Sequence, residues 1–125
     1  MLAVYFVGFL EGACAHFLDL ARGGIHVYAS FGPFLLQVFF VSLAVLDPLV
    51  VVLVVLARPE GIRLASWVTV LDVSANWWAN RHWLQDDPAR LLSLLPITLF
   101  GLFAVASSGP VLRVMKRPHL SCTIR

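Results

Sequence analysis

The chain has 125 residues, of which 60% are hydrophobic and only 13% are charged, and its mean hydropathy is +0.88. A soluble domain carries about 25% charged residues, so this chain has too few charges to cover a globule in water. The composition excludes a soluble enzyme, a disordered tail and a nucleic-acid binder. The formal net charge of +2 favours no class of partner, so the positions of the charges matter more than their sum.

Four apolar stretches dominate the sequence. A helix needs about 20 mostly apolar residues to cross the roughly 30 Å hydrocarbon core of a bilayer, and short linkers make successive helices antiparallel neighbours. We therefore predict an all-α fold, an integral membrane four-helix up-down bundle in the cell membrane. Its single domain covers residues 1–112, with spans at about 2–20, 34–57, 63–81 and 91–112, and a basic cytoplasmic tail follows at 113–125.

Basic residues near the ends of the spans predict the orientation, because cytoplasmic segments carry an excess of Lys and Arg. Six basic residues lie on the side of the N-terminus and three lie on the other side, which favours both termini in the cytoplasm. The six are Arg58, Arg63, Arg113, Lys116, Arg117 and Arg125, and the three are Arg22, Arg81 and Arg90. The tail is expected to lie against anionic lipid headgroups.

In the first stretch, Gly8 and Gly12 have the GxxxG spacing that lets two helices approach closely. The neighbouring helix could belong to the same chain or to a second copy, so the spacing leaves a homo-oligomer open.

Three carboxylates lie near the middle of three different spans, namely Glu11, Asp47 and Asp72. An ionisable group at the bilayer centre costs about 2.5–3.5 kcal/mol, and no Lys or Arg lies in the interior of a span to pair with these groups. The nearest candidate cation is His16. Because mutual repulsion and desolvation both oppose ionisation, we expect some of the three acids to be neutral at pH 7.

The three acids at one depth predict a polar pocket inside the bundle that holds a cation, a proton or an amine. The alternative interpretation is that protonated carboxyls form hydrogen bonds between helices. Pro48, directly after Asp47, favours a kink in the second span, which is one way to open a cavity.

Further polar residues extend this pocket toward the non-cytoplasmic side. Thr69, Asp72, Asn76 and Asn80 recur every three or four residues and so share one helical face. The predicted ligand-binding residues are Glu11, His16, Asp19, Asp47, Asp72, Asn76 and Asn80. The spacing of His and Cys matches no zinc motif, so no metal is predicted, and the sequence identifies neither a cofactor nor catalytic residues.

Glu11 also resembles the single functional glutamate in the first span of the small multidrug-resistance exporters, a family of similar size and four-span layout. The glycine- and tryptophan-bearing signatures of that family's later spans are absent. Asp47 and Asp72 have no counterpart in it.

The segment from Tyr5-Phe6 to Phe17-Leu18-Asp19-Leu20 resembles the start of the first span in the EXPERA family, which includes the sigma-2 receptor and the emopamil-binding sterol isomerases. The proline-bearing second span and the basic tail are similar too, although that family's long first extracellular loop is much shortened here. The resemblance implies a pocket that binds amines or stabilises a carbocation in a sterol-like ligand, with Glu11, Asp19, Asp47 and Asp72 facing it. The tract 39–78 is most similar to uncharacterised small bacterial membrane proteins.

These observations lead to one preferred function and two alternatives. The preferred function is binding or transport of a cation, a proton or a cationic lipid-like ligand at the mid-membrane carboxylates. The alternatives are an enzyme acting on a sterol- or isoprenoid-type lipid, in which an acid donates a proton, and a structural subunit whose acids pair with basic residues of another membrane protein. The expected partners are the lipid bilayer and one of these ligands or proteins.

Overall fold

The computed structural model describes residues 1–117, and within this range the chain forms helices and no strand. The prediction of an all-α fold is confirmed. The long helices are α1 (Leu2–Gly23), α2 (Phe34–Val55), α3 (Pro59–Asn80) and α5 (Arg90–Lys116), and the short ones are η1 (Gly24–His26), η2 (Ala29–Phe31) and α4 (Trp83–Asp86). Residues 118–125 of the predicted tail lie outside the described residues.

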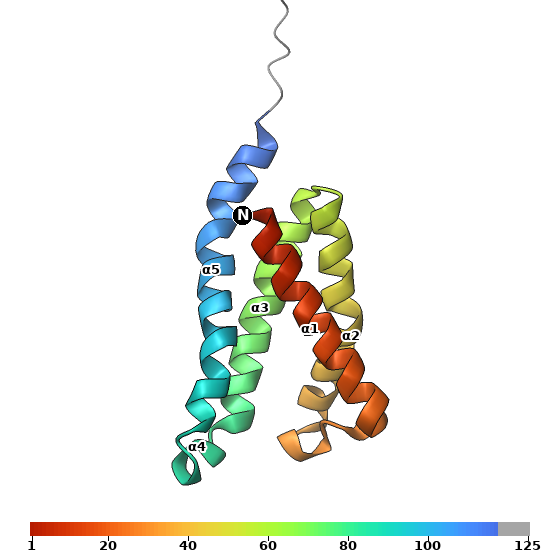
Figure 1. Ribbon diagram of the computed structural model, residues 1–125, viewed down its shortest axis with the longest axis vertical. Coiled ribbons are helices and arrows are strands. Elements are labelled where there is room, and N and C mark those ends of the chain that lie inside the picture. The colour runs from red at the N-terminus through yellow and green to blue at the C-terminus, as the bar shows by residue number, and fades with distance from the viewer. Residues whose placement is uncertain (118–125) are drawn as a thin grey trace, which may run out of the picture.

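The long helices pack in chain order, α1 against α2, α2 against α3 and α3 against α5. Figure 1 shows that they alternate in direction, and that the N-terminus and the last turns of α5 lie at the same end of the molecule. Helix α1 lies close to α5 near the N-terminus and diverges from it toward the opposite end.

Two helix ends, the start of α3 and the end of α5, lie four residues from the sequence-based boundaries. Helix α3 begins at Pro59 rather than near residue 63, because the fixed φ of proline suits the first helical position. At Gly61, an added Cβ would lie 2.8 Å from Cβ of Leu53, so this glycine lets α2 and α3 approach closely directly after their connection. Helix α5 continues to Lys116, four residues past the predicted end of the last span.

Three of the described helical segments are long and apolar enough to cross a membrane, namely Leu2–His26, Phe34–Val55 and Arg90–Lys116. Helix α3, which the sequence analysis takes as the third span, is not among them. The outward positions of α3 are nevertheless largely apolar, with Trp67 70% exposed and Leu71 51% exposed. Its polar side chains Asp72 and Asn76 are half-buried and lower the hydropathy of the helix.

Near the N-terminus, α1 is fixed to α5 by a buried tyrosine. The Tyr5 hydroxyl donates a hydrogen bond to the Ala104 carbonyl oxygen at 2.7 Å, and it lies 2.8 Å from Oγ of Ser107. The Tyr5 ring packs against Phe103, with ring centroids 5.7 Å apart. This half of the molecule is therefore closed around Tyr5, whose hydroxyl has two hydrogen-bond partners.

Candidate functional site

A cavity of about 420 Å³ lies between α1, α2, α3 and α5 and the connection from α1 to α2. It is farther from the N-terminus than the contacts of Tyr5. Its walls combine polar and aromatic side chains. The polar lining consists of Glu11, His16, Asp19, Tyr28, Asp47, Thr69, Asp72, Asn76 and Ser93. The apolar lining includes Phe9, Phe31, Phe40, Val68, Ile97 and Phe100.

The cavity brings together six of the seven predicted ligand-binding residues, and they come from three helices. The seventh, Asn80, does not line it. The Asn80 side chain lies one turn beyond Asn76 and donates a hydrogen bond to the Asn76 carbonyl oxygen at 2.9 Å. Asn80 therefore has a partner within its own helix.

Asp47 is the most buried of the four acids in the cavity, with 5% of the residue exposed. Within residues 1–117, no group donates a hydrogen bond to its carboxylate, and the nearest basic nitrogen is Nε2 of His16 at 3.9 Å from Oδ2. A Cβ added to Gly12 would lie 2.7 Å from the same Oδ2. Gly12 thus leaves the space that the Asp47 carboxylate occupies between α1 and α2.

The other glycine of the GxxxG pair faces a different helix. A Cβ on Gly8 would collide with the Phe100 ring of α5. Both glycines are therefore used for packing within the chain.

Asp72 has one partner on its own helix. The Asn76 side-chain amide donates to Oδ1 of Asp72 at 2.8 Å and to the Asp72 carbonyl oxygen at 2.9 Å. The neighbouring Thr69 hydroxyl donates to the Ala65 carbonyl oxygen at 2.6 Å. Asn76 thus holds the Asp72 side chain in place from one turn away, and the second carboxylate oxygen accepts no hydrogen bond from the described residues.

Tyr28 also lines the cavity and is not among the residues predicted from the sequence. Its buried phenol lies between two predicted residues: the hydroxyl donates to Oδ2 of Asp19 at 2.9 Å and lies 2.8 Å from Nδ1 of His16. Phe31 and Phe40 pack on the ring, with centroids 5.7 and 5.3 Å away. A tyrosine in an irregular connection has no helical phase, so no sequence signal places it beside α1.

Burial raises the pKa of the Tyr28 phenol, and its hydrogen bond to Asp19 adds to this effect. The phenol therefore keeps its proton at neutral pH.

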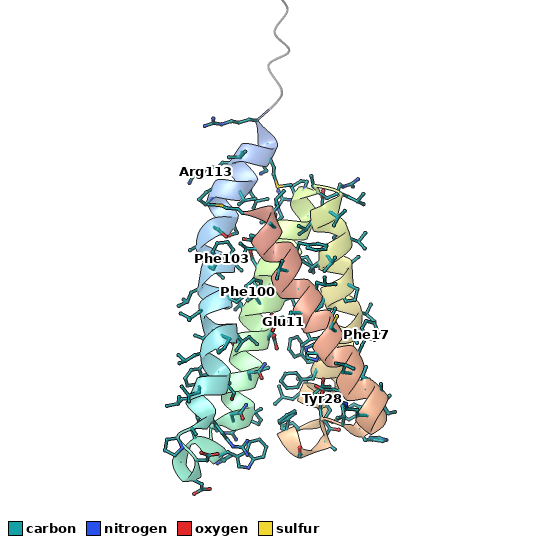
Figure 2. All side chains as sticks on the ribbon, in the orientation of Figure 1. Glu11, Phe17, Tyr28, Phe100, Phe103 and Arg113 are labelled. Carbon is teal, nitrogen blue, oxygen red and sulfur yellow. The ribbon has the colours of Figure 1, made fainter. Side chains whose placement is uncertain are left out.

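Glu11 lies where the cavity meets the surface. It is exposed, and so are Ser93 and Pro96 on the α5 side of the lining. Figure 2 shows the Glu11 side chain extending from α1 toward the side on which α3 and α5 lie, whereas Phe17 points outward. The cavity is thus open between α1 and α5, on the side where these helices diverge.

The charges of the lining have one sign apart from His16. Among residues 1–117, four carboxyl groups line the cavity, and neither Lys nor Arg does. Within the described part of the chain, no three His, Cys, Asp or Glu side chains lie close enough together to hold a metal ion. Acids spread around an aromatic cavity suit an organic cation, whose charge and apolar body can be contacted at once.

The chain matches no protein-family model, no curated protein and no solved structure. The resemblances to the small multidrug-resistance exporters and to the EXPERA family therefore stay predictions from the sequence. The function has to be inferred from the cavity itself.

Proposed function

We propose that this chain is a multi-pass protein of the cell membrane whose four long helices all cross the bilayer, with both termini in the cytoplasm. The outward apolar side chains of α3 support its assignment as a span in addition to α1, α2 and α5, because its polar groups Thr69, Asp72 and Asn76 line the cavity. The cationic side chains Arg58 and Arg63 at the end shared with the N-terminus support the orientation.

We further propose that the cavity binds a small organic cation, such as a protonated amine or a quaternary ammonium with an apolar body. The observation that carries this proposal is the convergence of Glu11, Asp19, Asp47 and Asp72 on one cavity. A bound cation would supply the positive charge that balances these acids. A volume of about 420 Å³ lies within the usual range of about 300–1,000 Å³ for small-molecule pockets.

The apolar walls support an organic cation rather than a bare inorganic ion. The rings of Phe9 and Phe100 meet edge to face, with centroids 5.6 Å apart, at the end of the cavity next to the closed half. Such aromatic side chains give favourable contacts to apolar groups and to quaternary ammonium ions. The carboxylates then provide the charge, and the rings select for the organic part.

The structural-subunit alternative predicts a different placement of the acids. Pairing with a partner's basic side chains would require acids on the outer surface, whereas Asp47 is buried, and Asp72, His16 and Asp19 are half-buried. Glu11 alone among the predicted acids in the spans is exposed. The burial pattern therefore favours a ligand inside the chain.

The test is the thermal stability of the purified protein in detergent with benzyltrimethylammonium as the probe. A ligand that binds only the folded state stabilises it by about 2.7 kcal/mol at 100 times its Kd. We expect the midpoint to rise with the probe and to stay unchanged with neopentylbenzene, its uncharged isostere. Asp72→Asn should reduce the rise by weakening the affinity at least tenfold.

The matched control is Asp86→Asn, which removes an exposed carboxylate in α4, outside the cavity. Its response to the probe should equal that of the unchanged protein. A response that is lost equally in both variants would mean that bulk negative charge attracts the probe. Equal responses to the cation and to its neutral isostere would contradict recognition by the acids.

A further inference from the structure

The hydrogen bonds around Tyr28 determine which nitrogen of His16 carries a proton. A phenol has one hydrogen, and Tyr28 gives it to Oδ2 of Asp19 at 2.9 Å. The short contact of 2.8 Å between the Tyr28 oxygen and Nδ1 of His16 must then use the hydrogen of Nδ1. The chain of two hydrogen bonds runs from His16 through Tyr28 to Asp19.

This arrangement turns the other ring nitrogen toward Asp47. Nε2 of His16 lies 3.9 Å from Oδ2 of Asp47, too far for a direct hydrogen bond but close enough for an ion pair or for one bridging water. With Nδ1 already protonated, a proton on Nε2 makes the ring cationic next to the Asp47 carboxylate. Without that proton, Nε2 presents a lone pair to Asp47.

The charged groups around His16 are acids, which attract a positive charge. The cavity-facing groups that affect the ring are Glu11 and Asp19 on α1, Asp47 on α2, Asp72 on α3 and Tyr28 in the connection. From α5, the polar group in the lining is Ser93, which is uncharged. In the described part of the chain, no basic side chain lines the cavity besides His16 itself.

We propose that His16 and Asp47 together hold one exchangeable proton, that Tyr28 and Asp19 position the His16 ring for this purpose, and that an organic cation in the cavity displaces the proton. The last part rests on the proposed function, whereas the first two rest on the geometry alone. In the displacement, the proton leaves Nε2 for solvent, the ring becomes neutral with its hydrogen on Nδ1, and the cation takes over the charge of the proton beside Asp47.

Tyr28 and Asp19 are positioning residues in this proposal, because they act on the proton through the ring of His16. Their test is the position of the hydrogen on that ring, which nitrogen NMR of histidine-labelled protein reports directly. His16→Gln identifies the His16 signals among those of the four histidines. We expect the neutral ring to carry its hydrogen on Nδ1.

The variant Tyr28→Phe should release this constraint and move the hydrogen to Nε2. The matched control is Tyr5→Phe, which removes the other tyrosine hydroxyl of the chain, on the α5 side of α1, and should leave the His16 signals unchanged. A neutral ring with its hydrogen on Nε2 in the unchanged protein would overturn the proposal. So would an unaltered position of the hydrogen in Tyr28→Phe.

The role of Asp47 is tested in the same spectra. Asp47→Asn should lower the ratio of charged to neutral His16 ring at least tenfold at a fixed pH, because the carboxylate that stabilises the second proton is gone. An unchanged ratio would overturn the sharing of the proton between the two residues.

The displacement is tested by adding benzyltrimethylammonium at the pH where half of the His16 rings are charged. We expect the cation to convert the charged ring to the neutral one and to release up to one half of a proton for each cation bound, as measured by calorimetry in buffers of different ionisation enthalpy. Binding without a change of the ring would overturn the displacement. Absence of binding would contradict the proposed function, while the hydrogen positions would still decide the proton site.

Discussion

The two halves of α1 meet their neighbours in different ways. In the N-terminal half, Tyr5 and Gly8 fit tightly against α5, and the one buried hydroxyl has two partners. In the C-terminal half, α1 diverges from α5 and lines the cavity with Glu11, His16 and Asp19 (Figure 1). The same helix thus packs tightly against α5 with one half and lines the candidate site with the other.

The comparison separates polar groups that stabilise the fold from those that are available to a ligand. Tyr5 acts as a hydrogen-bonded contact between helices, which is the interpretation that the sequence analysis considered for the acids. Asp47 is buried to a similar degree but accepts no hydrogen bond within residues 1–117. Within residues 1–117, every fully buried side-chain nitrogen and oxygen has a hydrogen-bond partner. The Asp47 oxygens accept no hydrogen bond, so they are accessible from the cavity and available to a ligand.

The largest expected effect comes from filling the closed half. Gly8→Ala places a methyl group against the end of the Phe100 ring, so the ring or α1 has to move. Such overpacking costs about 1–3 kcal/mol, and the replacement of a helical glycine by alanine returns about 0.5–1 kcal/mol. The free energy of unfolding, measured by titrating the protein in mixed micelles with a denaturing detergent, should therefore fall by up to about 2 kcal/mol.

The matched control for Gly8→Ala is Val4→Ile, which adds one carbon at an exposed position of α1. This substitution should change the free energy of unfolding by no more than about 0.5 kcal/mol. An equal loss in both variants would show that the contact of α1 with α5 is not as tight as the structure has it.

A smaller effect, of a different kind, is expected for the open half. Asp47→Asn should weaken the binding of benzyltrimethylammonium at least tenfold, which corresponds to about 1.4 kcal/mol. The free energy of unfolding should not decrease, because the carboxylate accepts no hydrogen bond that the variant would lose. Calorimetric titration and detergent unfolding measure the two quantities separately.

Glu60→Gln serves as the control for Asp47→Asn, since Glu60 is an exposed acid at the start of α3 and lies outside the cavity. It should leave the affinity unchanged. If Asp47→Asn instead kept the affinity and lowered the free energy of unfolding, Asp47 would stabilise the fold, as Tyr5 does, and would not bind the cation.

The smallest effect is expected for the hydroxyl of the closed half. Tyr5→Phe removes its contacts with Ala104 and Ser107 but keeps the ring against Phe103. Hydrogen bonds between membrane helices contribute about 0.6 kcal/mol on average, so the unfolding free energy should fall by roughly this amount. The affinity for the cation should stay the same, and a change in it would mean that the two halves of α1 are coupled.

Much of the helical layout follows from the sequence, because apolar length and linker composition are local properties. The predicted spans 2–20 and 34–57 lie close to α1 and α2, although α2 ends at Val55. The short elements η1, η2 and α4 were not predicted, since runs of three or four residues carry little periodic signal. The start of α3 was placed too late because Pro59 was read as part of a linker rather than as the first residue of a helix.

The candidate site was partly predictable for the same reason. Acids are so costly in an apolar span that each one indicates an inward direction, and Glu11, Asp47 and Asp72 do line one cavity. Helical phase also places Asn76 beside Asp72, whereas the lining of the cavity ends one turn before Asn80. Phase describes the direction of a side chain and does not show where a cavity ends.

The sequence by itself determined that the chain is helical and apolar, and that its buried acids needed a common environment, because hydropathy and helical period are properties of each segment. Only the tertiary structure decided that α1 diverges from α5 toward the end opposite the N-terminus (Figure 1). It also decided that Tyr28 joins His16 to Asp19. These features depend on distances between segments that are far apart in the chain or lack a regular period. How closely α1 approaches Phe100 on α5 and Asp47 on α2 depends on the missing side chains of Gly8 and Gly12.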